Sequence, residues 1–324
     1  MQAKSLIKSF QLPNRTTIAA CLAIAGITFN KFIVIQNSAF SGGAFEFFKT
    51  PNVLYPTIII PSLVLLLLTH KPQIKIGELL VFCVLGFYNV YFFMAAIMWM
   101  CLQSVSLKHL KKIRKFLTTL MFFQVALGIL QLALGKTLGL QVLGESTLTM
   151  ETPGASTISF LGVDLLRAYG SFAHPNILGA FVALSLTSFR SKFLILSTFS
   201  LNASLAQIFS PRLSYKNLLF PFLVLLIKNP WTNPNTFTQR TQQLTSSFDP
   251  IEYQPIHNVF LELYSESFVM VLAFLGLIYL INKKDRNLAF SILCLASFDH
   301  FLISHPQGIM LLGLVPLLSR SESN

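Results

Sequence analysis

The residue types best suited to chemistry occur in two segments that share one pattern, a histidine and an asparagine just before a long apolar run. The first segment reads AYGSFAHPNILGA and holds His174 and Asn176, with Arg167 immediately ahead of it. The second reads QPIHNVFLELYSE and holds His257 and Asn258. An imidazole titrates near neutral pH and can accept a proton from a hydroxyl, whereas an arginine is always charged and binds phosphate oxygens. The pattern therefore makes both segments candidates for a functional site, and an anionic ligand would suit the arginine.

A structural role accounts for only part of the first segment. Pro175 is tolerated at a helix start, and Asn176 would cap a helix that begins at Ile177. Neither Arg167 nor His174 is needed for that cap. A helix N-terminus also presents free N–H groups and a partial positive charge, which suit an anionic ligand. Helix capping and ligand binding both remain open for this segment.

Carboxylates lie in the apolar runs that follow the second segment. Asn258 would cap a long apolar helix, on which Glu262 and Glu266 are four residues apart and project from one face. Asp299 and His300 fall in a further apolar stretch, SFDHFLISHPQGIMLL. Ionisable groups in apolar segments are costly and usually face a cavity or a partner. A mutual structural pairing of Asp299 with His300 is as open as a direct role in the site.

The composition excludes an ordinary soluble domain. Of 324 residues, 53% are hydrophobic and only 11% are charged, against about 25% charged in a typical soluble protein. Several apolar runs approach the roughly 20 residues that cross a bilayer. The net charge of +12 lies mostly in short connectors, which is the positive-inside pattern of a membrane protein rather than a nucleic-acid-binding face. The four cysteines form no CxxC pair, so neither a metal site nor a disulfide framework is indicated.

We therefore predict an all-α fold, a polytopic membrane helix bundle of about ten to twelve transmembrane or re-entrant segments with two outer-face loops. The basic segment KHLKKIRK at 108–115 should lie inside. Run 76–103 then has an inner connector at both ends and should form two short helices that turn near Tyr88, whereas run 193–210 should be a re-entrant pair. The predicted regions are N-terminal helices over 1–136, an outer loop over 137–176, middle segments over 177–228, an outer loop over 229–257 and C-terminal helices over 258–324.

Three stretches, RAYGSFAHPNILGAF, QPIHNVFLELYSE and FDHFLISHPQGIMLL, resemble in this order the signature segments of the bacterial O-antigen ligase and O-antigen polymerase family. The resemblance covers roughly residues 116–318. It implies a polytopic GT-C-type glycosyltransferase that needs neither a nucleotide sugar nor a metal or other cofactor. The implied donor is a glycan on undecaprenyl diphosphate at the outer face of the cytoplasmic (inner) membrane. The acceptor varies within the family among lipid A core, another glycan, a protein and a cell-wall polymer.

The resemblance also implies a set of site residues. The outer His-Asn pair of the family matches His257 and Asn258, and an arginine ahead of that pair matches Arg240 best. We expect His257 to act as general base or to orient the acceptor, and Arg240 with Arg167 to bind the diphosphate. The other expected site residues are, for substrate binding, His174, Asn176, Asn258 and Glu266, and, as a supporting layer, Asp299 and His300.

Two alternatives remain open at this point. A transporter or flippase for a lipid-linked glycan would also use arginines, an intramembrane glutamate and broken helices. A non-catalytic membrane relative is the second alternative, because Leu201 in TFSLNASL stands where the family usually has the arginine of a Ser-Arg pair. Against transport, the sequence has no evident internal repeat, and its polar groups gather in the predicted outer segments.

Overall fold

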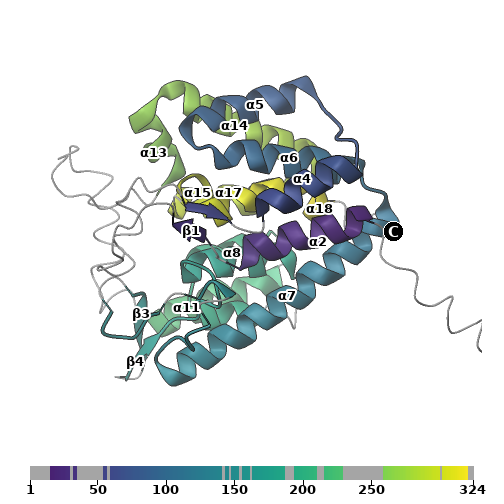
Figure 1. Cartoon of the computed structure of the whole chain (residues 1–324). Helices are drawn as coiled ribbons and strands as arrows, with labels where there is room; N and C mark the ends of the chain where they lie inside the picture. The colour runs from purple at the N-terminus through teal and green to yellow at the C-terminus, as the bar shows by residue number, and fades with distance from the viewer. Residues whose placement is uncertain are drawn as a thin grey trace, which may run out of the picture.

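The fold is mainly helical, with two small two-stranded antiparallel sheets (Figure 1). The computed structural model describes residues 15–29, 32–34, 54–56, 59–140, 143–145, 147–152, 155–160, 163–186, 193–209, 215–228, 258–299 and 301–319. The helices are α2 (Arg15–Thr28), α4 (Ile59–Thr69), α5 (Ile76–Tyr88), α6 (Tyr91–Ser104), α7 (Leu107–Leu134), α8 (Pro175–Ser185), the 3-10 helix η2 (Phe193–Thr198), α10 (Leu201–Ala206), the 3-10 helix η3 (Tyr215–Leu218), α11 (Leu219–Lys228), α13 (Val259–Glu266), α14 (Phe268–Lys284), α15 (Arg286–Phe298), α16 (Phe301–Ser304), α17 (Pro306–Gly313) and α18 (Val315–Ser319).

The two small sheets correct the expectation of an all-α fold. Strand β1 (Phe32–Val34) pairs antiparallel with β2 (Leu54–Pro56), and β3 (Thr157–Phe160) pairs antiparallel with β4 (Val163–Leu166). Strands β1 and β2 occupy parts of two predicted apolar runs, so helices α2 and α4 are shorter than those runs. Backbone pairing between distant segments, rather than local apolar content, decides the structure there.

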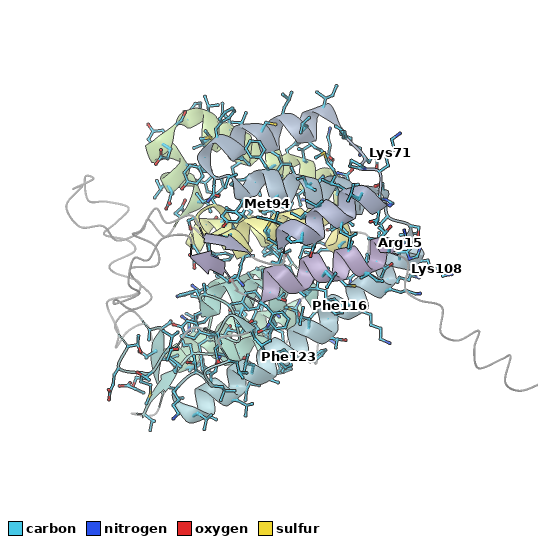
Figure 2. All side chains as sticks on the ribbon, in the orientation of Figure 1. Arg15, Lys71, Met94, Lys108, Phe116 and Phe123 are labelled. Atoms are coloured by element: carbon cyan, nitrogen blue, oxygen red, sulfur yellow. The ribbon has the colours of Figure 1, made fainter. Side chains whose placement is uncertain are left out.

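One end of the bundle, which we call the basic end, collects positively charged residues, among them the run 108–115, which lies on the first turns of α7 rather than in a connector. The Thr17 hydroxyl lies 3.0 Å from His109 Nδ1 and joins the start of α2 to the start of α7. The Ser104 hydroxyl donates to the Lys71 carbonyl at 3.0 Å and joins the end of α6 to the segment before α5. Figure 2 shows three cations of this end close together on one side of the molecule, Arg15, Lys71 and Lys108.

A buried carboxylate ties three further helix ends together at the basic end. Glu78, in the first turn of α5, is 4% exposed. It accepts hydrogen bonds from Trp99 Nε1 at 2.9 Å and from the Gln103 amide, and it pairs with Lys284 Nζ at 3.2 Å. The ammonium of Lys284 also lies 5.2 Å from the centre of the Trp99 ring. Helices α5, α6 and α14 are therefore joined at this end by a satisfied ion pair.

The opposite end, which we call the polar end, carries the starts of α8, α13 and α17. Gln307, in the first turn of α17, donates to the Ile27 carbonyl at the end of α2 at 2.9 Å. Asn89, between α5 and α6, donates to the Ile303 carbonyl at 3.2 Å. Helices α5, α6 and α7 consequently run back and forth between the two ends. The predicted division of run 76–103 into two helices near Tyr88 is confirmed.

Three other apolar runs are broken, two of them at a side chain that caps the next helix. The long helix expected after Asn258 stops at Glu266, because the Ser267 hydroxyl accepts from the Val269 N–H and starts α14. Asp299 lies beyond the end of α15 rather than inside a continuous helix. Run 193–210 breaks at Phe199, whose φ is +46°, before Ser200 caps α10.

Within the described residues, α7 is the helix long and apolar enough to cross a membrane, with 28 residues and a mean hydropathy of 1.9 in its most apolar window. It passes from the basic end, where it begins at Leu107, toward β3 and β4 (Figure 1). Several other described helices are apolar but shorter, with 10–17 residues, and of these α2 and α8 pack against α7. The segment 167–176, which carries predicted site residues, packs against α7.

Gly128 permits that close approach, which generates a stability prediction. A Cβ at Gly128 would lie 2.7 Å from the Ala168 Cβ, whereas a Cβ at Gly77, also on a helix, would meet nothing within 4 Å. Overpacking of this kind costs about 1–3 kcal/mol. We expect Gly128→Ala to lower the melting temperature of the detergent-purified protein and Gly77→Ala to leave it unchanged or slightly higher. Equal effects of the two substitutions would contradict the close packing of α7 on this segment.

Candidate functional site

A chain of three buried polar side chains connects two of the predicted motifs. Arg167 follows β4, Asn176 lies in the first turn of α8 and Asp299 follows α15. Arg167 Nη2 donates to Asn176 Oδ1 at 2.8 Å, and Asn176 Nδ2 donates to Asp299 Oδ2 at 2.6 Å. The three residues are 6%, 8% and 5% exposed. The asparagine amide therefore bridges a buried cation and a buried anion that are 132 positions apart in the sequence (299 minus 167).

The remaining contacts of Arg167 anchor the bridge to other elements. Its Nε donates to the Thr198 carbonyl at 2.7 Å, and its Nη1 donates to the Ser156 hydroxyl at 2.7 Å. All three guanidinium nitrogens thus bond to protein groups, which join the end of η2, the segment before β3 and the start of α8. In this structure Arg167 positions the surrounding elements. Its expected contact with a diphosphate stays a prediction.

The electrostatic balance of this cluster explains its burial. Taking a charge out of water costs several kcal/mol unless hydrogen bonds or an opposite charge compensate it. Arg167 and Asp299 are of opposite sign, and the Asn176 amide offers an acceptor to one and a donor to the other. Hydrogen bonds to charged groups contribute about 1.5–3 kcal/mol each. The cluster is consequently a strong and directional tie between α8 and the end of α15.

The cap of helix α8 differs from the sequence prediction. The helix begins at Pro175 rather than Ile177, and His174 rather than Asn176 caps it. His174 Nδ1 accepts from the Asn176 backbone N–H at 3.1 Å, which requires that nitrogen to be unprotonated. Because the imidazole provides the cap, the Asn176 side chain is left to make the bridge. The same arrangement recurs where His305 caps α17.

Asn258 fulfils its predicted capping role and adds a tie that the sequence did not predict. Its Oδ1 accepts from the Phe260 N–H at 2.8 Å and from the Leu261 N–H at 3.1 Å. Its Nδ2 donates to the Ser297 carbonyl at 2.8 Å, two residues before Asp299. The start of α13 therefore lies beside the end of α15. All three stretches that carry the family resemblance meet at the polar end through Arg167–Asn176–Asp299 and Asn258–Ser297.

Glutamines of α7 hold the backbone of the first motif, and the sequence analysis missed them. Gln131 Oε1 accepts from the N–H groups of Tyr169 and Gly170, at 3.1 and 2.9 Å, and its Nε2 donates to the Gly170 carbonyl at 2.7 Å. Gln124 Oε1 accepts from the Ser171 N–H at 2.8 Å. Gly170 has a φ of +60°, which only glycine adopts readily. Two glutamines seven residues apart share one face of a helix, and this spacing in an apolar run was the available signal.

A buried carboxylate supports the same glutamine. Glu145 is 4% exposed and accepts from Gln131 Nε2 at 2.7 Å and from the Leu138 N–H at 2.7 Å. Nearby, the Tyr169 hydroxyl accepts from the Ser156 N–H at 2.6 Å. Burial raises the pKa of the Tyr169 phenol above its usual value, so this hydroxyl is neutral at physiological pH. These contacts fix residues 169–171 against α7 and tie Ser156 to Tyr169.

The two glutamates of α13 have different surroundings. Glu262 Oε1 accepts from the Tyr88 hydroxyl at 3.0 Å, which links α13 to the end of α5. Glu266 is exposed on the last turn of α13, and its predicted substrate contact stays a prediction. The predicted positions of Arg240, His257 and His300 lie outside the described residues.

The comparisons with known proteins identify no family for this chain. No protein-family model, no curated protein and no solved structure matches it.

Removal of the Asn176 amide tests the bridge. In Asn176→Ala, Arg167 loses an acceptor and Asp299 loses a donor, and buried polar groups left without partners cost about 1–3 kcal/mol each. We expect a clear fall in the melting temperature of the purified protein. Ser204→Ala is the matched control, because Ser204 is fully buried but its hydroxyl donates only to the Leu201 carbonyl of its own helix. A fall no larger in Asn176→Ala than in Ser204→Ala would contradict the bridge.

Proposed function

We propose that this protein is a multi-pass membrane glycosyltransferase of the O-antigen ligase and polymerase type. It would transfer a glycan from undecaprenyl diphosphate to a lipid, glycan or protein acceptor. The observation that carries the proposal is the meeting of three motif-bearing segments at one end of the bundle. The links between them are Arg167–Asn176–Asp299 and the hydrogen bond from Asn258 to Ser297.

The distribution of apolar and charged residues supports the membrane placement. Large apolar side chains are exposed on many helices, including Leu68 on α4 at 80% and Phe87 on α5 at 83%. Exposed apolar surface on this scale is unusual for a soluble monomer and suits contact with lipid. The cations gather at the basic end, which by the positive-inside rule would face the cytoplasm. The polar end would then face the outside of the cytoplasmic membrane, where the lipid-linked donor is presented.

In the proposed reaction the acceptor hydroxyl attacks the anomeric carbon of the donor sugar. The new carbon–oxygen bond forms as the bond to the diphosphate oxygen breaks, and undecaprenyl diphosphate leaves with the bonding electrons. His257, which directly precedes Asn258 in the chain, would take the hydroxyl proton, since an imidazole is an effective base near neutral pH. Arg240, with Arg167 as the second proposed cation, would offset the charge that develops on the leaving diphosphate.

The contacts in the structure indicate what the other proposed site residues would do. His174 and Asn258 set the starts of α8 and α13 as caps, and Asn176 and Asp299 hold the two motifs at a fixed separation. Glu266 is exposed at the end of α13, and it is proposed to bind a hydroxyl of the glycan. Positioning of this kind can supply much of a rate enhancement because it fixes the reacting groups before reaction.

The charge distribution favours this chemistry over transport. Alternating-access transporters keep their binding site near the middle of the membrane, between broken helices. Among the described residues, the Asp, Glu, Lys and Arg side chains lie toward helix ends or in connectors, and the Arg167 cluster lies at the polar end. A site for a donor whose diphosphate stays at the outer interface would be found there.

A reconstituted transfer assay tests the function. Purified protein is incubated with a glycan linked to undecaprenyl diphosphate and a glycan or lipid acceptor, and the product is followed by mass spectrometry. We expect His257→Ala and Arg240→Ala to reduce the transfer rate by about 100-fold or more, with Gly77→Ala as the folded, active control. Movement of the donor between leaflets without a new glycosidic bond would replace the proposal by a flippase, and the absence of both activities would leave a non-catalytic relative.

Orientation is tested separately with single cysteines in a variant that lacks the four native ones. Leu107 at the basic end is 56% exposed, and Leu140 in the segment after α7 is 39% exposed. In intact cells a membrane-impermeant maleimide should label Leu140→Cys, and it should label Leu107→Cys only after the membrane is opened. The reverse pattern would place the proposed site on the cytoplasmic side and exclude an outer-face donor.

A further inference from the structure

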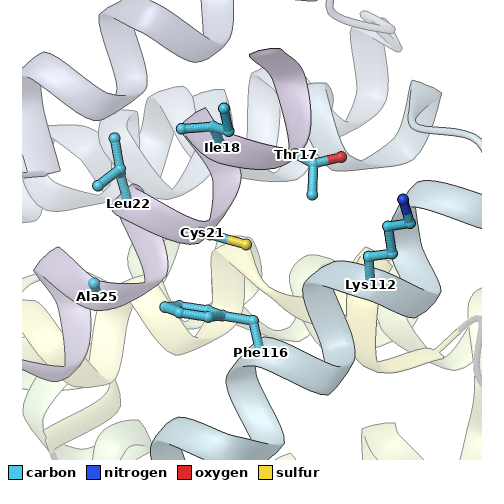
Figure 3. Close-up of a pocket in the computed structure, with 7 residues that line it drawn as sticks. All are labelled: Thr17, Ile18, Cys21, Leu22, Ala25, Lys112 and Phe116. Carbon is cyan, nitrogen blue, oxygen red and sulfur yellow. The ribbon is translucent and has the colours of Figure 1, made fainter. Parts of the chain in front are cut away.

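A groove on the side of the bundle lies between α2 and α7, close to the basic end (Figure 3). It has a volume of about 430 Å³. The residues that line it are Thr17, Ile18, Cys21, Leu22, Ala25, Lys112 and Phe116. From Thr17 to Ala25 the groove follows about two turns of α2, or roughly 12 Å along the helix axis.

The lining changes character along the groove. Figure 3 shows the apolar side chains of Leu22 and Phe116 toward one end of it and the amine of Lys112 with Thr17 toward the other. Lys112 is exposed, and the Thr17 hydroxyl lies 3.0 Å from His109 Nδ1. Ile18 and Leu22 are 38% and 43% exposed, so the apolar part is open to the surroundings of the bundle. The groove is therefore amphipathic, with its polar part nearer the basic end.

The charges around the polar part are of one sign. On α7 the neighbours of Lys112 in sequence are basic, in the run KHLKKIRK from Lys108 to Lys115, and Arg15 begins α2 beside them. Cations at the cytoplasmic surface of a membrane attract anionic headgroups, by about 1 kcal/mol each, or roughly fivefold in affinity. A chain-shaped apolar cleft under a cationic rim fits an occupant with an anionic head and an apolar tail.

We propose that this groove binds one anionic phospholipid of the inner leaflet. The headgroup phosphate contacts the exposed amine of Lys112, and an acyl chain lies along α2 between Ile18 and Phe116. The inference rests on the membrane placement within the proposed function, but not on glycan transfer. The occupant is distinct from the proposed glycan donor, because the groove lies near the basic end and the donor's diphosphate would be bound at the polar end.

Fluorescence quenching by brominated lipid tests the site in the full-length protein. Leu22→Trp places a reporter on the groove, and Leu130→Trp places one on an exposed part of α7 outside it. Both are reconstituted in vesicles of phosphatidylcholine with roughly one-fifth phosphatidylglycerol, a content that leaves the anionic lipid in the minority. In one set of vesicles the phosphatidylglycerol is brominated, and in the other the phosphatidylcholine, at the same lipid composition. The protein without an added tryptophan gives the background fluorescence of its own tryptophans.

The expected result is a preference for brominated phosphatidylglycerol that is about fivefold greater at Leu22→Trp than at Leu130→Trp. Adding Lys112→Gln should remove the preference, whereas adding Lys111→Gln, an exposed neighbour that does not line the groove, should largely keep it. Equal losses in the two lysine variants, or no preference at Leu22→Trp, would overturn the site and leave only diffuse attraction or a second copy of the chain in the groove. Absence of quenching at both reporters by either lipid would instead refute the membrane placement.

Discussion

The organisation of the polar end depends on one side-chain amide, that of Asn176. It accepts a hydrogen bond from the Arg167 guanidinium and donates one to the Asp299 carboxylate, and all three groups are almost completely buried. A buried cation and a buried anion are tolerated because each has a partner of the right kind. The bridge fixes the start of α8 against the end of α15, and the Asn258–Ser297 hydrogen bond adds the start of α13 to the same place. Any chemistry at this end would use a frame set by these contacts.

Polar side chains inside the apolar bundle serve mainly as ties between segments. Gln124 and Gln131 bind the backbone of the first motif, and Gln307 bonds both the Ala173 N–H and the Ile27 carbonyl. At the basic end, Glu78 joins helices in the same way through its contacts with Trp99 and Lys284. Since apolar packing is non-directional, such hydrogen bonds specify how irregular segments join regular helices. The lipid groove proposed between α2 and α7 is a different kind of feature, an apolar surface that the protein itself does not fill.

In the structure, some of the predicted site residues have roles that differ from those that the sequence suggested. Arg167 and Asn176 were expected to contact substrate, and both are engaged with protein groups in this structure. The proposed transfer chemistry therefore rests most heavily on His257 and Arg240, with Arg167, Asn176 and Asp299 as the frame. The Ser200 hydroxyl caps α10 directly before Leu201, the position at which the family resemblance would place an arginine. Ser200 therefore has a structural role as a helix cap, and its neighbour is a leucine rather than an arginine.

Local sequence determined the features that depend on neighbouring residues alone. It predicted the two helices on either side of Asn89 and the cap at Asn258, because caps and turns act within a few positions. Only the tertiary structure decided that His174 rather than Asn176 caps α8, since the Asn176 side chain bonds to Asp299, 123 positions away in the sequence, as well as to Arg167. It also decided the strands β1 and β2, the contact of Asp299 with Asn176, and the use of Gln124 and Gln131. In each of these cases the deciding partner comes from a distant segment, and the physical reason is that a buried polar group must find its hydrogen bond wherever the fold supplies one.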